Sequence, residues 1–335
     1  MSAVTGQRVV VTGGAGFIGS HVVEHLLSRD CEVTVIDNMS TGRRQNLKGL
    51  ECDTLNIVEA DITDLDSIGP YFDRVAAVFH LAALADIVPS IQHPMQYYRA
   101  NVFGSACVAE AARIGGAQRL VYAASSSCYG IPDQYPTQES AEIRPQYPYA
   151  LTKRLGEETV LHWGQVYGIP TVSLRLFNVY GPRSRTSGTY GAVFGVFLAQ
   201  KLAGEPFTVV GDGTQSRDFI HVTDVARAFV AAAESDLAGE ILNVGNSAPV
   251  SVNRLVELLG GPIVNVPVRP GEPDVTWADT SRILASLDWR PQMSFEDGVA
   301  GMLEVIEYWR DAPVWTPDSI AEATADWFEN LSKED

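Results

Sequence analysis

Tyr149 and Lys153 are the residues whose types and spacing most directly suggest chemistry, because they lie four positions apart in Tyr149-Ala-Leu-Thr-Lys153. On a helix this spacing places a phenol and an ammonium on one face. The phenol can accept or donate a proton, and a neighbouring cation lowers its pKa. The alternative is a surface helix on which the aromatic ring covers the lysine stem. Upstream lies the cluster Ser125-Ser126-Ser127. Its first hydroxyl can hydrogen-bond the same substrate oxygen, so we expect Ser125, Tyr149 and Lys153 to be catalytic.

A glycine-rich turn near the N-terminus predicts a dinucleotide-binding site. The apolar run Val9-Val-Val-Thr12 leads into Gly13-Gly-Ala-Gly16-Phe-Ile-Gly19 and then into an apolar helix. This is the strand, turn and helix context that the dinucleotide fingerprint requires. Gly13 permits the tight turn, Gly16 lets a pyrophosphate approach the backbone, and Gly19 lets the helix pack closely on the sheet.

Charged residues after the second and third predicted strands bear on which dinucleotide binds. Asp37 ends the second strand, where a carboxylate binds ribose hydroxyls and repels a 2′-phosphate, so NAD is favoured over NADP. Arg43 and Arg44 follow closely and offer an alternative partner for that phosphate. Asp61, before Ile62, ends the third strand and is placed to meet the adenine. For both aspartates the alternative role is that of a helix N-cap.

The expected base, Tyr149, needs more than one positive charge beside it. Lowering a phenol pKa from about 10 to near 7 requires about 4 kcal/mol. At an effective dielectric of about 20, one cation about 4 to 6 Å away supplies about 3 to 4 kcal/mol. We therefore expect Lys153 and the positive nicotinamide to act together, because Lys153 alone is marginal.

The composition is that of an ordinary soluble globular protein of 335 residues with 46% hydrophobic residues. Its net charge of −17 argues against a sequence-independent grip on nucleic acid or an anionic membrane. The start of the chain has no leader pattern and no apolar run reaches membrane-spanning length, so we expect a cytoplasmic protein. The four cysteines lack metal-ligand spacing, so we expect no metal and read them as reduced packing residues, with Cys128 a remote candidate nucleophile.

Short β-branched runs alternate with helical stretches, which predicts an α/β fold with a Rossmann-like, doubly wound parallel sheet. The predicted strands are 8–12, 32–37, 56–61, 76–81, 119–125 and 171–178, and the predicted helices are 18–28, 94–114 and 149–167. After Asn178 the chain becomes rich in Gly and Pro, which suggests a smaller, irregular C-terminal substrate lobe. We expect residues 1–178 to bind NAD, with about 217–247 returning to that domain, and residues 179–216 and 248–335 to bind substrate. Residues 315–331 are expected to form one terminal helix capped near Thr316-Pro317.

Taken together, these motifs resemble an extended short-chain dehydrogenase/reductase, most closely the nucleotide-sugar 4-epimerases of the UDP-glucose/UDP-N-acetylglucosamine type. The resemblance covers the chain up to about Trp309. It rests on Thr12–Gly19, Asp37-Asn38, Asp61-Ile62, His80-Leu-Ala-Ala83, Asn101, Ser125, Tyr149/Lys153, Leu174–Pro182, Gly211–Asp224 and Arg269-Pro-Gly-Glu272.

The resemblance also implies roles for individual residues. The cofactor set would be Gly13, Gly16, Phe17, Ile18, Gly19, Asp37, Asn38, Ser40, Thr41, Gly42, Asp61, Ile62, Leu81, Ala82, Ala83, Asn101, Tyr149, Lys153 and Phe177. The substrate set would be Ser125, Ser127, Tyr149, Asn178, Ala192, Val193, Arg217, Arg269 and Thr276. Within it, Asn178 and the two arginines would hold the diphosphate, as fixed cations do in an acidic protein. For Arg217 the alternative is a salt bridge to Asp218.

Within this family, the residues after Ser125 favour a 4-epimerase. Dehydratases and uronate decarboxylases carry acidic residues there, whereas this chain has Ser126-Ser127-Cys128. The alternatives are a nucleotide-sugar dehydratase, a 4-ketoreductase, or an idle NAD-binding sensor. Asp86 and Phe194–Phe197 depart from the usual pattern, while Thr276, standing where stricter members have tyrosine, leaves room for an N-acetyl group. A UDP-sugar is the favoured substrate.

Helices 94–114 and 149–167 carry more apolar residues than a sheet-facing stripe needs. Related enzymes pair these two helices in a dimer, so we expect a homodimer.

Overall fold

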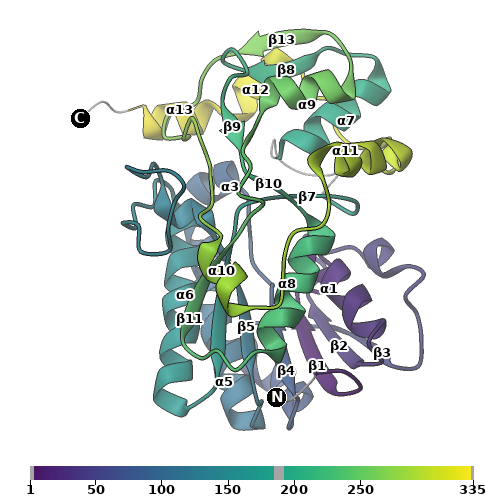
Figure 1. Ribbon diagram of the computed structural model, residues 1–335, viewed down its shortest axis with the longest axis vertical. Helices are drawn as coiled ribbons and strands as arrows, with labels where there is room; N and C mark the ends of the chain where they lie inside the picture. Colours follow the sequence, from purple (N-terminus) through teal and green to yellow (C-terminus); the bar gives the residue numbers. More distant parts are fainter. Residues whose placement is uncertain (1–3, 185–191, 333–335) are drawn as a thin grey trace.

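The computed structural model describes residues 4–184 and 192–332, and its main body is a seven-stranded sheet flanked by helices (Figure 1). The strand order is β11-β6-β5-β4-β1-β2-β3, and every neighbouring pair is parallel. The strands are β1 (Arg8–Thr12), β2 (Glu32–Asp37), β3 (Leu55–Glu59), β4 (Ala77–His80), β5 (Leu120–Ser125), β6 (Thr171–Leu176) and β11 (Glu240–Val244). This sheet confirms the predicted Rossmann-like fold class.

The central strands are rich in apolar residues, many of them β-branched, because both faces of the sheet are covered there. In β1, Val9 and Val11 belong to one core cluster and Val10 to the other, as the period of two along a strand requires. Helices α1 (Phe17–Leu27) and α8 (Val222–Glu234) pack on the first face. Helices α5 (Gly104–Gly115) and α6 (Pro148–Tyr167) pack on the second face. The sheet is therefore fixed between two helical layers.

The predicted helix 94–114 forms but changes its winding. It consists of α4 (Pro94–Tyr97), a π-helical turn η3 (Tyr98–Phe103) and α5. Such π-turns inside a helix often occur at functional sites. This π-helical turn carries Asn101, whose side chain hydrogen-bonds to Leu84 and to Thr152 of α6.

Two other predicted elements are each divided into two in the structure, and the strand predicted over 56–61 ends early, at Glu59. The strand predicted over 171–178 is divided, because β7 (Asn178–Tyr180) leaves the main sheet and pairs with β10 (Phe219–His221). The single terminal helix predicted over 315–331 is two helices, α12 (Pro317–Ala323) and α13 (Ala325–Leu331). Between them the Thr324 hydroxyl donates to the carbonyl oxygen of Ile320 at 2.7 Å, and the backbone of Thr324 leaves the helical region. The start of α12 is capped by Thr316, as expected.

A second group of elements lies beyond the carboxyl ends of the main strands and forms the upper lobe in Figure 1. Its strands pair as β8 (Phe207–Val210) with β13 (Ile263–Val266) and β9 (Ser216–Arg217) with β12 (Val250–Ser251). Its helices are α7 (Val193–Ala203), α9 (Val252–Leu259), α11 (Phe295–Glu304), η5 (Ile306–Trp309) and α12. These elements bury an aromatic cluster that includes Phe194, Phe219 and Trp309. We propose to divide the chain into cofactor and substrate domains as the sequence suggests.

The remaining short elements lie in the connections between these strands and helices. They are η1 (Arg44–Leu47), α2 (Leu65–Ile68), η2 (Gly69–Phe72), α3 (Ile87–Gln92), η4 (Ser126–Tyr129) and α10 (Ser281–Ser286).

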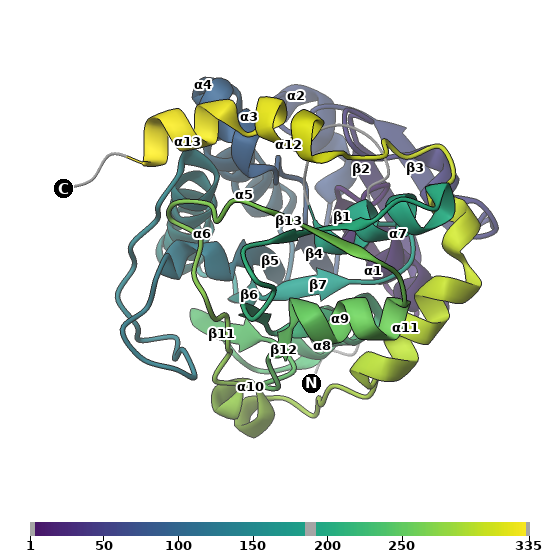
Figure 2. The ribbon, with the colours of Figure 1, turned by 90° about the horizontal axis from the view of Figure 1, so that it is seen from above.

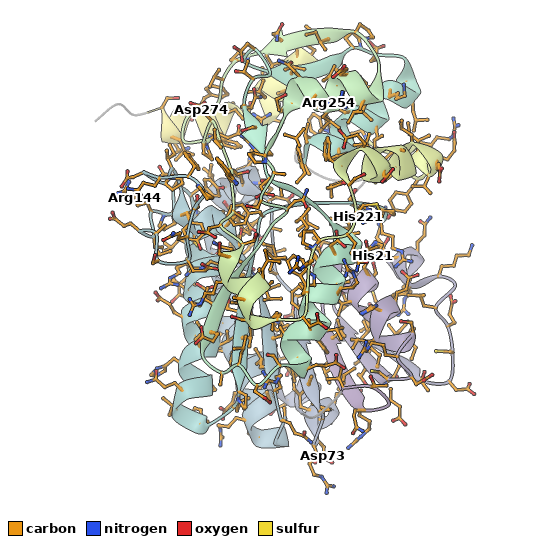
Figure 3. The ribbon with its side chains drawn as sticks, in the orientation of Figure 1. His21, Asp73, Arg144, His221, Arg254 and Asp274 are labelled. Atoms are coloured by element: carbon orange, nitrogen blue, oxygen red, sulfur yellow. The ribbon has the colours of Figure 1, made fainter. Side chains whose placement is uncertain are left out.

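Two histidines lie at the waist between the main sheet and the upper lobe (Figure 3). One ring nitrogen of His21, on α1, lies 3.0 Å from the carbonyl oxygen of Pro182. Burial lowers the pKa of His21 to about 4 and also lowers the pKa of His221, at the end of β10. Both imidazoles are therefore neutral near pH 7, and they need no acidic partner where the main sheet meets the upper lobe.

Among residues 4–184 and 192–332, no helix combines the length and the apolar composition that crossing a membrane requires.

Candidate active site

A cleft of about 880 Å³ lies between the main sheet and the upper lobe. Its lower wall comes from the carboxyl ends of β2, β3 and β4, including Asp37, Asp61 and Leu81. Its upper wall includes Ala192 and Val193 at the start of α7. Open α/β sheets bind ligands at this edge, so the cleft is the candidate active site.

The predicted glycine turn borders this cleft at the start of α1. Gly13 has φ +72°, and a Cβ there would lie 2.6 Å from the backbone nitrogen of Ala82. A Cβ on Gly19 would lie 2.1 Å from the carbonyl oxygen of Gly13. Only glycine fits both positions, and the first amides of α1 are left without intrahelical partners. Phe17 and Ile18, the first two residues of α1, line the cleft. Because the amides at this end of the helix lack intrahelical partners, the turn fits a bound pyrophosphate.

Asp37, at the end of β2, supports the turn from behind. Its carboxylate accepts backbone N–H groups of Ala15 at 3.0 Å and Met39 at 2.9 Å. Burial raises the pKa of Asp37, and these two hydrogen bonds oppose that rise. Gly42 packs against the same carboxylate, where a Cβ would lie 2.6 Å from its oxygen. Asp37 lines the cleft and is not a helix N-cap, so the ribose role proposed for it stands as a prediction.

Asp61 is also not a helix N-cap, because Asp64 caps α2 instead. The carboxylate of Asp61 accepts from the Asn38 amide at 3.0 Å and from the backbone N–H of Thr63 at 2.8 Å. β3 ends two residues before Asp61, at Glu59, so Asp61 lies in the following turn. Asp61 and Asn38 thus join two loops at the end of the cleft where the adenine is predicted.

The two arginines that offered a site for a 2′-phosphate have other partners. Arg43 lies over the ring of Tyr308, 4.9 Å from its centroid, and donates to its hydroxyl. Arg44 forms an ion pair with Glu59 at 2.8 Å. Neither arginine lines the cleft within the described residues, which agrees with a site for NAD.

Tyr149 lies in the first turn of α6 and reaches into the cleft. Pro148 at the first helical position sets this start of the helix. Burial raises the pKa of Tyr149, and a hydrogen bond with Ser125 opposes the rise. Ser125 ends β5, and its hydroxyl oxygen lies 2.8 Å from that of Ser127. The structure therefore brings the predicted phenol and serine together.

Lys153 lies one turn further along α6 and is 5% exposed. Its ammonium nitrogen is 4.4 Å from the centroid of the Tyr122 ring. Burial lowers the pKa of Lys153 to about 7, with the charge of Glu157 opposing the shift. The fold alone thus raises the pKa of Tyr149 and weakens the charge of its expected activator. That the bound cofactor cation lowers the Tyr149 pKa together with Lys153 stays a prediction.

Asn101 has a bridging position rather than a place in the cleft wall. Its side chain accepts from the backbone N–H of Leu84 at 2.8 Å and donates to the carbonyl oxygen of the same residue at 3.0 Å. It also donates to the hydroxyl of Thr152 on α6 at 3.1 Å. Asn101 thereby ties the segment after β4, which includes the predicted cofactor residues Ala82 and Ala83, to the helix of Tyr149.

Arg217 and Arg269 lie together at the upper-lobe side of the cleft. Both face Glu272, with nitrogen to oxygen distances of 3.0 Å and 3.6 Å. The suggested pairing of Arg217 with Asp218 is wrong, because Asp218 is buried and accepts from backbone N–H groups such as that of Ala278 at 2.8 Å. The two arginines form a compact cationic pair that fits a diphosphate.

Thr276 is hydrogen-bonded to Asn178, the first residue of β7. Its hydroxyl donates to the Asn178 side-chain oxygen at 2.7 Å and accepts from the backbone N–H of Asp218 at 3.0 Å. Asn178 lines the cleft and Thr276 does not.

Most of the predicted site residues line the cleft. Those that do are Gly13, Gly16, Phe17, Ile18, Gly19, Asp37, Asn38, Ser40, Thr41, Asp61, Ile62, Leu81, Ala82, Ala83, Tyr149, Asn178, Ala192, Val193, Arg217 and Arg269. Those that do not are Gly42, Asn101, Ser125, Ser127, Lys153, Phe177 and Thr276. Phe177 is 7% exposed and packs with Cys128 and Tyr129 instead.

The sequence did not assign several residues that the structure places in the cleft wall. They include Arg99, Glu272, Trp315 and Trp327. Trp327 lies in the terminal segment that the resemblance did not cover. Its place in the site follows from contacts with loops far away in sequence, for which the local pattern carries no signal.

The structure also bears on the cysteines and on metals. All four cysteines are free thiols. Cys128 is buried, and burial raises its pKa to about 12, so it is not an activated nucleophile. Within the described residues, no group of three His, Cys, Asp or Glu side chains is arranged to hold a metal ion.

Comparisons with known proteins agree with this geometry. The model of the NAD dependent epimerase/dehydratase family matches residues 9–245. A UDP-glucose 4-epimerase of Mycolicibacterium smegmatis is 35% identical over 315 residues, covering 91% of this chain and 99% of that protein. The structure of a UDP-N-acetylglucosamine 4-epimerase from Methanobrevibacter ruminantium M1, in complex with UDP-N-acetylmuramic acid, is 34% identical and superimposes with a TM-score of 0.84. The match covers 89% of this chain and 99% of the chain of that epimerase.

Relatives at similar distance catalyse a different reaction. UDP-glucuronic acid decarboxylase 1 of Arabidopsis thaliana is 32% identical over 307 residues, covering 88% of this chain and 69% of that protein. The reaction type is therefore a separate question from the family. Because the family model matches more than half of the chain and the mycobacterial relative matches nearly its whole length, this chain belongs to the NAD dependent epimerase/dehydratase family and uses NAD as its cofactor.

Proposed function

We propose that this protein interconverts the two C4 epimers of a nucleotide-diphosphate sugar, with a UDP-hexose or UDP-N-acetylhexosamine as its substrate. The proposal rests on one observation above all: Tyr149 reaches into the cleft with Ser125 as its hydrogen-bond partner, and no carboxylate follows Ser125. The 4-epimerases among its relatives support the same reaction.

The chemistry needs one group that moves a proton and one that moves a hydride. NAD held by the glycine turn and by Asp37 would supply the hydride chemistry, with no net change in its oxidation state over the cycle. Tyr149 takes the proton of the C4 hydroxyl as C4 is oxidised to a ketone, while Ser125 holds that oxygen in line. After the 4-keto sugar has turned, C4 receives the hydride on its other face and its oxygen takes back the proton. No net oxidation or reduction occurs.

The segment after Ser125 separates this reaction from elimination or decarboxylation. Removing a proton from C5 requires a base beside the sugar. Ser126-Ser127-Cys128 offers hydroxyls and a buried thiol, and burial raises the pKa of that thiol to about 12. This segment supports reversible oxidation at C4 and offers no base for C5.

Asp86 is the acidic residue of the cleft that lies toward Tyr149. It precedes α3 and lines the cleft, and its charge adds to the burial that raises the Tyr149 pKa. A sugar with its own carboxylate would meet like charge here. Asp86 therefore supports a neutral sugar over a uronate. The same carboxylate makes dehydration the second candidate reaction, with Asp86 as the base for C5.

The deciding experiment follows C4 configuration by NMR after incubation with UDP-, GDP-, CDP-, ADP- and dTDP-sugars. An epimer mixture with no net NADH supports the proposal. Release of a 4-keto product would establish the dehydratase instead, and net NAD(H) turnover would establish a ketoreductase.

A further inference from the structure

The C-terminal segment brings a tryptophan into the wall of the cleft. Helices α12 and α13 lie along one edge of the molecule (Figure 2), and α13 packs against α3. Trp327, on α13, is 3% exposed and lines the cleft. Its indole N–H donates to the carbonyl oxygen of Pro270 at 2.8 Å. The ring is thus held beside the loop that carries Arg269.

Trp327 contacts that arginine directly. The guanidinium carbon of Arg269 lies 5.5 Å from the centroid of the Trp327 ring, within the range of a cation–π interaction. Glu272 also faces Arg269, and their nitrogen to oxygen distance of 3.6 Å is too long for a strong hydrogen bond. Arg269 is 12% exposed, and the indole face restricts where its fork of donors can point.

On its other side, the Trp327 ring lies near Tyr147, which in turn lies beside the expected base, Tyr149. Its ring centroid lies 6.3 Å from that of Tyr147, and the rings of Tyr147 and Tyr149 are stacked, with centroids 6.3 Å apart and an angle of 7° between their planes. The neighbouring Asp326 accepts from the Gln92 amide of α3 at 2.7 Å. Helix α13 is therefore held between the loop that carries Arg269 and the segments that carry Gln92 and Tyr147.

We propose that Trp327 is a positioning residue for nucleotide-diphosphate binding, acting by holding the Arg269 guanidinium toward the cleft. The inference rests on the proposed function, because it takes Arg269 as a diphosphate ligand. Without the ring, Arg269 can adopt more rotamers, and ordering them on binding weakens affinity. A cation–π contact of this kind is worth about a two- to thirtyfold change in dissociation constant.

Calorimetric titration of NAD-saturated protein with UDP, dTDP and GDP tests the proposal. Trp327→Ala should weaken every nucleotide that the wild type binds by about two- to thirtyfold, with Trp327→Phe in between, and should leave NAD affinity unchanged. The control is Gln92→Ala, which removes the hydrogen bond between α3 and Asp326 of α13 and leaves the ring in place. It should change nucleotide affinity by less than about twofold.

A double-mutant cycle with Arg269→Ala shows whether Trp327 acts through Arg269. In the Arg269→Ala background, replacing Trp327 should have little further effect on nucleotide affinity. Equal losses in both backgrounds would overturn the proposal, as would an unchanged affinity in Trp327→Ala or a parallel loss of NAD binding. If Trp327→Ala does not fold, the same cycle is run with Trp327→Phe.

The outcomes separate this inference from the proposed reaction. Coupled losses of nucleotide affinity in a protein that shows no C4 epimerisation would sustain the role of Trp327 and refute the epimerase. Epimerisation with no effect of Trp327 on nucleotide affinity would do the reverse. Absence of nucleotide binding by the wild type would overturn both.

Discussion

Replacing Lys153 with methionine should remove turnover and at the same time stabilise the folded protein at neutral pH. Lys153 is 5% exposed, and burial lowers its pKa from 10.5 to about 7. The unfolded chain therefore holds this proton more tightly than the folded protein does. At pH 7 that difference costs the fold about 4 kcal/mol, a large part of the stability of a typical domain.

The sign of the pH dependence follows from the same two pKa values. Between pH 7 and pH 10.5 the unfolded state binds more protons, so wild-type stability rises with pH, by at most about 1.4 kcal/mol per unit. Below pH 7 both states are protonated and the full cost remains. Methionine has no proton to lose, so Lys153→Met lacks this dependence.

Urea unfolding of the NAD-free wild type and of Lys153→Met measures the effect. The stability advantage of the variant should shrink by about 3 kcal/mol between about pH 7 and about pH 9.5. The contact of the Lys153 ammonium with the Tyr122 ring exists only while Lys153 is protonated, and it is already included in the pKa of Lys153 in the fold, so it adds no separate pH dependence. Lys48→Met, at an exposed lysine, controls for the loss of one positive charge. A stability difference that stays constant with pH would show that Lys153 is charged in the fold and would refute the reasoning.

Three further predictions follow from the site and from the helices beside it. Tyr149→Phe should retain the fold and NAD but lose at least about a hundredfold in turnover, and near-normal epimerisation would contradict its role as the base. Asp86→Asn should raise kcat/KM for a UDP-uronate relative to a neutral UDP-hexose by about tenfold, since it removes like charge, and an unchanged ratio would place Asp86 away from the sugar. The protein should form a homodimer through α4, α5 and α6, which expose Met95 (73%), Ile114 (64%) and Val166 (54%), and a single-chain mass by light scattering at micromolar concentration would refute this.

The parts of the fold that the sequence predicted well are those whose signal is local. β1 and β2 match the predicted ranges residue for residue, because a run of β-branched residues buried on both faces has few alternatives. The glycine turn was equally predictable, since Gly13 and Gly19 occupy positions where a Cβ would collide with backbone.

The upper lobe was harder to predict because its structure depends on contacts between distant segments. β8 pairs with β13, which follows more than fifty residues later in the chain. Both strands are short, and their sequences do not indicate which strand each one pairs with. Arg217 pairs with Glu272 and not with its neighbour Asp218, whose carboxylate is used by three backbone N–H groups. Trp327 reaches the cleft because α13 packs against α3 and its indole N–H donates to the distant carbonyl oxygen of Pro270.

The hydrogen bonds of Thr276 point to a second role for this residue beside the one implied by the resemblance. The resemblance implied that it borders the C2 substituent of the sugar, but its hydroxyl is hydrogen-bonded to Asn178 and to the Asp218 backbone. Thr276→Val keeps the shape and leaves both partners unpaired, which costs about 1 to 3 kcal/mol. If Thr276 acts through Asn178, KM should rise equally for UDP-glucose and UDP-N-acetylglucosamine, and Thr276→Ser should restore it. A loss confined to one of the two sugars would show instead that the side chain faces C2.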